Sequence, residues 1–114
     1  MSAHWLLFYD YVEDYLDRRT PLRPAHFEVA RAAVDAGHLV LAGAFADPAD
    51  GAALVFCCDD VSTVEAFVAA DPYVRDGLVT SWRIRPWTVV AGSSFAGVPP
   101  PAAPDSAGDS AGAA

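Results

Sequence analysis

Residues 38–58 read HLVLAGAFADPADGAALVFCC and consist of two apolar runs separated by a polar turn. The first run covers residues 38–45 and the second covers 52–58, and both have the length typical of a β-strand. The segment between them, ADPADG, contains a proline and an Asp-Gly pair, which indicate a loop. We therefore predict an antiparallel pair of strands near the middle of the chain.

An amphipathic helix is predicted before this strand pair. In FEVARAAVDAG, residues 27–37, apolar side chains recur at Phe27, Ala30 and Val34, which is the spacing of one helix face. Gly37 supplies a C-terminal stop, because glycine readily adopts the left-handed conformation that ends helices. We expect the stripe from Phe27 to Val34 to face the core.

A second helix is predicted after the strand pair. The segment STVE, residues 62–65, matches a capping box, in which the side chains of Ser62 and Glu65 satisfy free backbone amides at a helix start. The helix should end by Asp71, because a residue before a proline is disfavoured in the α region. Its apolar face consists of Val64, Phe67 and Val68.

Both ends of this pattern carry a further predicted strand. HWLLFYDYV, residues 4–12, is an aromatic-rich run, and LVTSWRIRPWTVV, residues 78–90, alternates Trp82 and Ile84 with arginines. The order β-α-β-β-α-β predicts an α+β, ferredoxin-like fold, with a four-stranded antiparallel sheet and two helices on one face. Because several strands are apolar on both faces, we expect a homodimer that packs sheet against sheet.

The chain divides into one predicted domain and a tail. Its 114 residues suit a single small domain, which we assign to residues 1–92. Residues 93–114 contain four of the nine prolines and few bulky apolar side chains. Such a composition cannot offset the entropy of ordering, so we predict a disordered Pro/Ala/Gly/Ser tail.

The charge composition excludes several classes of function. The chain carries 15 acidic residues against seven basic ones, for a net charge of −8, and all seven basic residues are arginine. We expect no nucleic-acid partner, because phosphate binding rests on a basic surface. The lack of lysine rules out an internal Schiff base and the lysine of a P-loop.

The cysteines and the N-terminal run bear on the compartment. Cys57 and Cys58 are adjacent, which prevents the long-loop disulfide of a secreted scaffold. The N-terminal apolar run meets Asp10 too early for a signal peptide or a membrane-spanning helix. We therefore expect a cytoplasmic protein with no membrane partner.

Two longer segments resemble a known family. RRTPLRPAHFEVARAAVDAGHLVLAGAF, residues 18–45, and FVAADPYVRDGLVTSWRIRPW, residues 67–87, are similar to the YciI-like (YCII-related) family. The shared features are an Arg-x-x-His at the first helix, a glycine in the second strand, an Asp-Pro-Tyr after the second helix and a closing Pro-aromatic pair. The resemblance covers roughly residues 4–90, with Gly43-Ala44 where the family usually has Gly-Pro.

This resemblance implies both an assembly and a site. It implies a dimeric ferredoxin-like α/β barrel with a pocket in each subunit, holding a histidine and an aspartate proposed as a catalytic pair. By position these are His26 and Asp71. Most members are uncharacterised, although one branch eliminates chloride from a chlorinated hydroquinone, and the fold is similar to that of muconolactone isomerases.

The residues themselves support this chemistry only in part. His26 follows Pro24 in the first turn of a predicted helix, where the helix dipole favours a neutral, base-competent imidazole. An aspartate that accepts its ring proton would leave the other nitrogen as a general base. The alternatives are a solvated histidine at a helix start and, for Asp71, a turn residue before Pro72. Since 45 positions separate the pair, the sequence does not establish contact.

Four further residues are candidates for substrate binding. Arg23 lies one turn before His26 and could hold a carboxylate or enolate oxygen, or pair with a surface acid. Tyr73 offers a hydroxyl that could orient a substrate oxygen. Tyr9 and Trp87 are candidates for an aromatic pocket wall, although core packing explains them equally well.

Neither a metal nor a nucleotide cofactor is indicated. The three histidines, His4, His26 and His38, lack the short spacing of metal ligands, and adjacent cysteines on a strand point to opposite faces. A glycine-rich phosphate loop is lacking as well. We expect no metal and no cofactor.

The sequence supports two hypotheses of function, one of an enzyme and one of a non-catalytic protein. The first is a small cofactor-independent enzyme in which His26, oriented by Asp71, performs acid/base chemistry on a small cyclic or aromatic oxygenated substrate, by elimination or isomerisation. The second is a non-catalytic dimeric protein that binds a small molecule or assists a biosynthetic enzyme.

Overall fold

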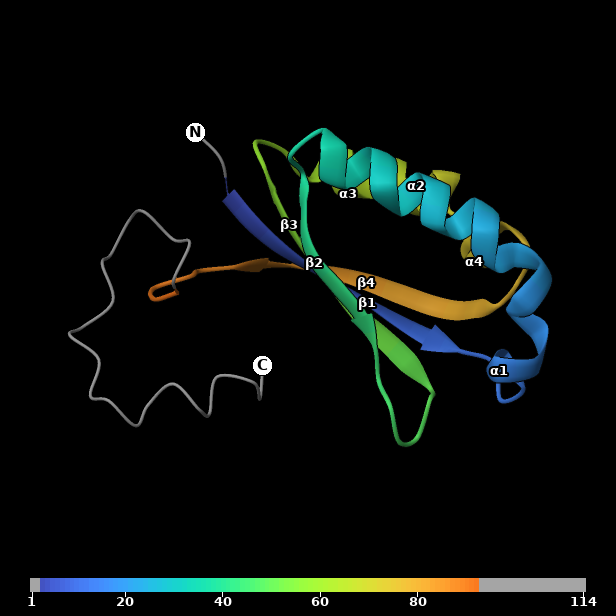
Figure 1. Cartoon of the computed structure of the whole chain (residues 1–114). Coiled ribbons are helices and arrows are strands. Elements are labelled where there is room, and N and C mark those ends of the chain that lie inside the picture. The colour runs from blue at the N-terminus through green and yellow to red at the C-terminus, as the bar shows by residue number, and fades with distance from the viewer. Residues whose placement is uncertain (1–2, 93–114) are drawn as a thin grey trace, which may run out of the picture.

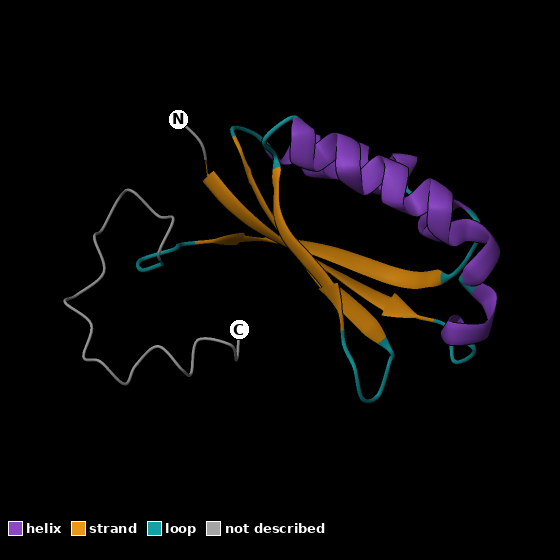
Figure 2. Cartoon of the chain, in the orientation of Figure 1, coloured by secondary structure: helices purple, strands orange, loops and turns teal. Residues whose placement is uncertain are grey.

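A computed structural model describes residues 3–92, which form one sheet covered on one face by helices (Figures 1 and 2). The tail predicted for residues 93–114 lies outside the described residues. The strands are β1 (Ala3–Tyr11), β2 (Leu39–Ala44), β3 (Gly51–Cys58) and β4 (Val79–Trp87). The helices are α1 (Tyr15–Arg18), a 3₁₀ turn (Thr20–Leu22), α2 (Arg23–Asp35), α3 (Val61–Ala70) and α4 (Pro72–Arg75).

The sheet has the order β2-β3-β1-β4, and all neighbouring strands are antiparallel. This is the four-stranded antiparallel sheet expected from the β-α-β-β-α-β pattern, and the α+β class is confirmed. The central pair also forms as predicted, with Ala42 opposite Leu54 and Gly43 opposite Ala53. α2 and α3 run across the same face of the sheet (Figure 1).

The core lies between the sheet and these helices. Strand residues of alternating position point toward the helices, as the period of two requires. The fully buried side chains include Leu7 and Tyr9 of β1, Phe56 of β3 and Val64 of α3. The opposite face of the sheet carries Leu6, Phe8, Val55, Arg83 and Arg85, as the strand register shows.

Helix α2 is rotated relative to our prediction. Phe27 and Val34, expected in the core, are 53% and 54% exposed. Ala30, the middle residue of the predicted stripe, does pack against the core, together with Val29 and Ala33. These small side chains let α2 lie close to the layer beneath it, and the same rotation turns His26 inward, because residues three and four apart share a helix face.

The predicted capping box of α3 is wrong. The N-cap is Asp60, whose carboxylate accepts a hydrogen bond of 3.3 Å from the backbone nitrogen of Ser62. The helix therefore begins at Val61, one residue before the predicted cap. Aspartate and serine are almost equally good N-caps, so the extended backbone of Asp60 decided between them.

Gly51 explains how the β2–β3 hairpin sits against β1. A β-carbon at this position would collide with the backbone carbonyl oxygen of Tyr9 and lie 3.3 Å from the Phe45 ring. The close approach places the end of the hairpin over β1, where Tyr11 donates a backbone hydrogen bond to Asp50. No helix between residues 3 and 92 has the length and apolar character required to cross a membrane.

Candidate active site

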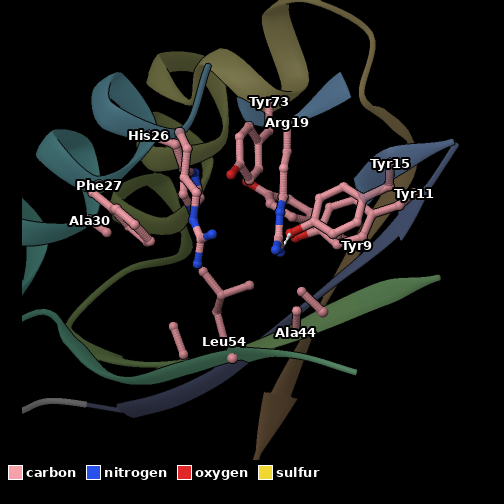
Figure 3. Close-up of a pocket in the computed structure, with 14 residues that line it drawn as sticks. Tyr9, Tyr11, Tyr15, Arg19, His26, Phe27, Ala30, Ala44, Leu54 and Tyr73 are labelled. Atoms are coloured by element: carbon pink, nitrogen blue, oxygen red, sulfur yellow. Dashed lines mark hydrogen bonds between the residues drawn. The ribbon is translucent and has the colours of Figure 1, made fainter. Parts of the chain in front are cut away.

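A cavity of about 230 Å³ lies where the start of α2 and the α3–α4 junction meet the sheet. Aromatic, arginine and small apolar side chains make up its wall (Figure 3). The lining residues are Tyr9, Tyr11, Tyr15, Arg19, Arg23, His26, Phe27, Ala30, Ala42, Gly43, Ala44, Ala52, Leu54 and Tyr73.

His26 and Asp71 are in direct contact beside this cavity. The Nδ1 atom of His26 lies 2.8 Å from Oδ1 of Asp71, within hydrogen-bonding distance. His26 is the fourth residue of α2, and its side chain is 14% exposed and lines the cavity. His26 belongs to α2 and Asp71 to the junction between α3 and α4, and the inward rotation of α2 brings them together.

Asp71 is completely buried and holds three hydrogen-bond partners. The Tyr9 hydroxyl donates to Oδ2 at 2.8 Å, and the backbone nitrogen of Tyr73 donates to Oδ1 at 3.0 Å. The third partner is His26. Asp71 ends α3 and is also the N-cap of α4, so the turn and the histidine contact use the same carboxylate.

Tyr73 forms a second constraint on the imidazole. Its ring is stacked on that of His26, with 3.8 Å between the ring centroids and 4° between the ring planes. Figure 3 shows the two rings side by side at the cavity. Burial raises the pKa of Tyr73 to about 12, with a further contribution from Tyr15, while Arg23 and Arg19 oppose the shift. The phenol therefore stays protonated at neutral pH and can donate a hydrogen bond.

Tyr9 also stays protonated. Burial raises its pKa, and the charge of Asp71 and the hydrogen bond to that carboxylate act in the same direction. Tyr9 was expected as a wall of an aromatic pocket, and it does line the cavity. Its hydrogen bond to Asp71 was not foreseen, and this bond makes it a positioning residue for the carboxylate.

The remaining predicted residues divide into one that lines the cavity and one that does not. Arg23 lines it, with the guanidinium carbon 5.0 Å from the centre of the Phe27 ring. Trp87, expected in the pocket, is 46% exposed at the end of β4 and lies outside the cavity wall. Trp87 lies opposite His4 in the strand register. Successive side chains of a strand point to alternate faces, so Trp87 is on the face that points away from the helices and Trp82 is on the other.

Tyr11, Tyr15 and Arg19 line the cavity, although the sequence did not lead us to predict this. Tyr11 and Tyr15 stack with 3.8 Å between ring centroids, and Arg19 lies beside them, with its guanidinium nitrogen 3.5 Å from the Tyr15 hydroxyl. A signal was available, since residues 11, 15, 19, 23 and 27 follow one another at a spacing of four and all line the cavity. We predicted no helix or strand for residues 13–22, although α1 and a 3₁₀ turn give this segment helical geometry.

The described residues contain no group of three or more His, Cys, Asp or Glu side chains placed to hold a metal ion. The polar side chains at the cavity are one histidine with its aspartate, the surrounding phenols and two guanidinium groups. A histidine that hydrogen-bonds a buried carboxylate through one nitrogen can act as a base through the other.

Comparison with known proteins places the chain in a family. The fold is similar to that of 5-chloro-2-hydroxyhydroquinone dehydrochlorinase (TftG) from Burkholderia phenoliruptrix AC1100, solved in complex with 2,5-dihydroxybenzoquinone, with a TM-score of 0.65 and 17% sequence identity. The alignment covers 75% of this chain and 93% of that one, and at this identity it shows a shared fold. A search of curated proteins finds no match. The family model of the YCII-related domain matches residues 3–88, and the chain belongs to that family.

Proposed function

We propose that this protein is a cofactor-independent enzyme that moves a proton on a small cyclic or aromatic oxygenated substrate. His26 is the general base and Asp71 orients it. The observation that carries the proposal is the 2.8 Å contact between Nδ1 of His26 and the buried carboxylate, at the wall of a cavity. Membership of the YCII-related family supports it.

The contact supports Nε2 of His26 as the atom that takes the proton. An ionised carboxylate only accepts hydrogen bonds, so in the proposed mechanism Nδ1 of His26 carries a hydrogen and donates a hydrogen bond to Asp71. The lone pair of Nε2 is then free to take a proton from a substrate carbon. Asp71 stabilises the imidazolium that forms, and the stacked Tyr73 ring favours the cation through its π face.

Two reactions balance with this arrangement. In an elimination, Nε2 takes the proton, the C–H electrons form a double bond, and the leaving group departs with its own electron pair. In an isomerisation, the proton returns to a different carbon and the substrate neither gains nor loses atoms. Both regenerate neutral His26, by release of the proton to solvent in the first case and to the product in the second.

The cavity suits a small ring. Its volume of about 230 Å³ exceeds the roughly 150 Å³ that admits benzene in an engineered cavity. Flat tyrosine and phenylalanine rings and short alanine side chains form its wall, an arrangement that accepts a planar molecule. The TftG structure, which holds 2,5-dihydroxybenzoquinone, supports a hydroquinone or quinone as the substrate class.

The outer face of the sheet supports a homodimer as the working form. Leu6 and Phe8 of β1 and Val55 of β3 lie on the face that points away from the helices. Leu41 of β2, also on this face, is 63% exposed. Packing this surface against a second copy would remove it from water and give a sheet-on-sheet assembly.

The test is proton transfer on a substrate of this class. Wild-type protein and His26→Asn are incubated with 5-chloro-2-hydroxyhydroquinone in heavy water, and release of chloride and exchange of ring hydrogens are followed by NMR. We expect turnover with wild type and its loss with His26→Asn, while His38→Asn, whose ring is outside the cavity wall, behaves as wild type.

Equal rates for wild type and His26→Asn would contradict the proposal. Binding of the compound to wild type without exchange or chloride release would favour the non-catalytic alternative. Far-UV circular dichroism of both variants shows whether a loss of rate reflects the missing base or a change in fold.

A further inference from the structure

Arg19 and Arg23 both line the cavity. Arg19 contacts Tyr15, with the guanidinium carbon 5.3 Å from the ring centre, and Arg23 lies over Phe27. Within residues 3–92, neither guanidinium is paired with a carboxylate. The neighbouring Arg18 differs, since its guanidinium lies 3.8 Å from the carboxylate of Asp14.

The cavity wall is positive in a chain that is negative as a whole. The protein has 15 acidic residues and a net charge of −8, yet the residues that line the cavity include no aspartate or glutamate. Asp71 lies behind His26 and is completely buried. Two of the seven arginines of the chain thus lie together in a wall that has no acidic side chain among its described residues, which focuses a positive potential inside the cavity.

Both arginines lie close to the reacting histidine. Arg19 lies between α1 and the 3₁₀ turn with αR backbone, and Arg23 begins α2 four residues later, a spacing that puts side chains on one side of a helical run. Both lower the pKa of Tyr73, against the larger effect of burial, so both guanidinium charges act on the phenol that stacks on His26. Figure 3 shows the Arg19 side chain extending into the cavity between the rings of Tyr73 and Tyr15.

We propose that Arg19 and Arg23 form a two-point anion site in this cavity, and that the substrate is a planar ring bearing a carboxylate or an ionised enol oxygen. This deepens the proposed function by naming the charge of the substrate, and its reactive consequence rests on that function. When His26 takes a proton from the ring, negative charge moves onto the ring oxygens. Guanidinium groups already in place stabilise that charge, because they hydrogen-bond oxyanions with two parallel donors.

The two arginines have different environments. Arg19 is half-buried and held against Tyr15, while Arg23 is exposed at the start of α2. We therefore expect Arg19 to contribute more to binding, since a charged hydrogen bond gains strength where water is excluded. Arg23, which lines the cavity and is exposed to solvent, contributes to capture of the anion.

The experiment compares two probes that differ in charge. Gentisate is a hydroquinone that carries a carboxylate, and gentisamide is its neutral amide. Binding of each is measured by calorimetry and by NMR shifts of His26 and Tyr73, for wild type, Arg19→Gln, Arg19→Lys, Arg23→Gln and the control Arg18→Gln. Wild type should bind gentisate about tenfold or more tightly than gentisamide, as expected for one or more charged hydrogen bonds.

The variants should separate the contributions of the three arginines. Arg19→Gln should lose most of the preference for gentisate, Arg19→Lys should keep part of it, and Arg23→Gln should show a smaller loss. Arg18→Gln should keep the full preference, because Arg18 points to Asp14 and does not line the cavity. An unchanged preference in the double variant Arg19→Gln/Arg23→Gln would overturn the inference, as would failure of gentisate to shift His26 and Tyr73 at millimolar concentration.

The result of this experiment can contradict the anion site without contradicting the proposed function, and the reverse also holds. The preference for the anion is a binding property and should persist in His26→Asn, in which proton transfer is lost. A wild-type protein that prefers gentisate but never exchanges ring hydrogens would retain the anion site and lose the enzyme proposal. Turnover of neutral rings with no preference for gentisate would retain the enzyme proposal and contradict the anion site.

Discussion

Nδ1 of His26 lies 2.8 Å from Oδ1 of Asp71, although 45 residues separate them in the sequence. Asp71 is buried and accepts hydrogen bonds from Tyr9 and from the backbone of Tyr73 as well. The orientation of the imidazole therefore depends on a carboxylate that β1 and the first turn of α4 hold in place.

Replacement of Asp71 by Asn should reduce turnover far more than substrate binding. The amide oxygen of asparagine can still accept the hydrogen bond that caps α4. It carries no negative charge, so it accepts the hydrogen bond from Nδ1 of His26 less strongly than the carboxylate does. We expect kcat on a hydroquinone substrate to fall by roughly a hundredfold to ten-thousandfold, with KM little changed. Asp76→Asn, at an exposed position after α4, is the control and should behave as wild type. A kcat within twofold of wild type for Asp71→Asn would show that the carboxylate does not orient the base.

Replacement of Tyr9 by Phe should weaken the fold and disturb the site. In the described part of the chain, every buried side-chain nitrogen and oxygen has a hydrogen-bond partner, and this change leaves one oxygen of Asp71 without a donor. We expect the free energy of unfolding to fall by about 1–3 kcal/mol and the pH profile of the rate to shift. Urea denaturation and rate measurements across pH check both effects.

The matched control for this change is Ser81→Ala. It also removes a hydrogen bond between a hydroxyl and an aspartate, from Ser81 to Asp10 at 2.7 Å, but at an exposed position. Its effect on stability should stay within about 0.5 kcal/mol. Equal losses in the two variants would mean that burial of Asp71 does not strengthen its dependence on Tyr9.

Stability should decline at high pH because of the buried phenols. The pKa of Tyr73 is raised from 10.0 to about 12 in the folded protein, and burial raises the pKa of Tyr9 and Tyr11 in the same direction. Above pH 10 the unfolded chain loses phenol protons that the folded chain keeps, so unfolding becomes more favourable. This contribution is fully present below pH 10 and is lost as the pH rises through about 12.

Urea denaturation at a series of pH values, with tyrosinate absorbance as a second readout, measures this decline. Tyr73→Phe has no ionisable phenol at that position, and its stability should fall less steeply over the same range. A wild-type stability that stays flat between pH 10 and 12 would contradict the pKa of about 12 for Tyr73.

Two glycines in the central hairpin should respond differently to alanine. A methyl group at Gly51 would meet the Tyr9 carbonyl oxygen and the Phe45 ring, while one at Gly43 would have no atom within 4 Å. We expect Gly51→Ala to lower the free energy of unfolding by about 1–3 kcal/mol, as overpacking does. Gly43→Ala should change it by no more than about 0.5 kcal/mol. Thermal unfolding of both variants tests the difference, and a tolerated Gly51→Ala would show that β1 and β3 can move apart at that point.

The order of elements could be predicted because it rests on local patterns. Apolar runs of strand length, the Asp-Gly turn before β3 and the stop signals at Gly37 and Pro72 act within a few residues, and each formed where expected. The capping box was an error of the same local kind, since Asp60 and Ser62 are both good caps and only the backbone conformation selects one.

The site was predictable in part. The motifs indicated His26, Asp71, Arg23 and Tyr73, but an aromatic residue on a strand end gives no sign of whether it faces a cavity. Trp87 and Tyr9 looked alike in this respect, and only Tyr9 lines the cavity. Arg19 and Tyr15 were missed because we predicted no helix or strand for the segment that holds them.

By itself the sequence determined the α+β class, the β-α-β-β-α-β order and the residues from which a site could be built. Those properties depend on the spacing of apolar residues and of turn residues along the chain, which can be read from the sequence directly. Only the tertiary structure decided which side of α2 faces the core, and with it the contact between His26 and Asp71. The physical reason is that the rotation of a helix about its axis is set by packing against residues distant in the sequence. The same rotation of α2 leaves Phe27 exposed and turns His26 toward Asp71.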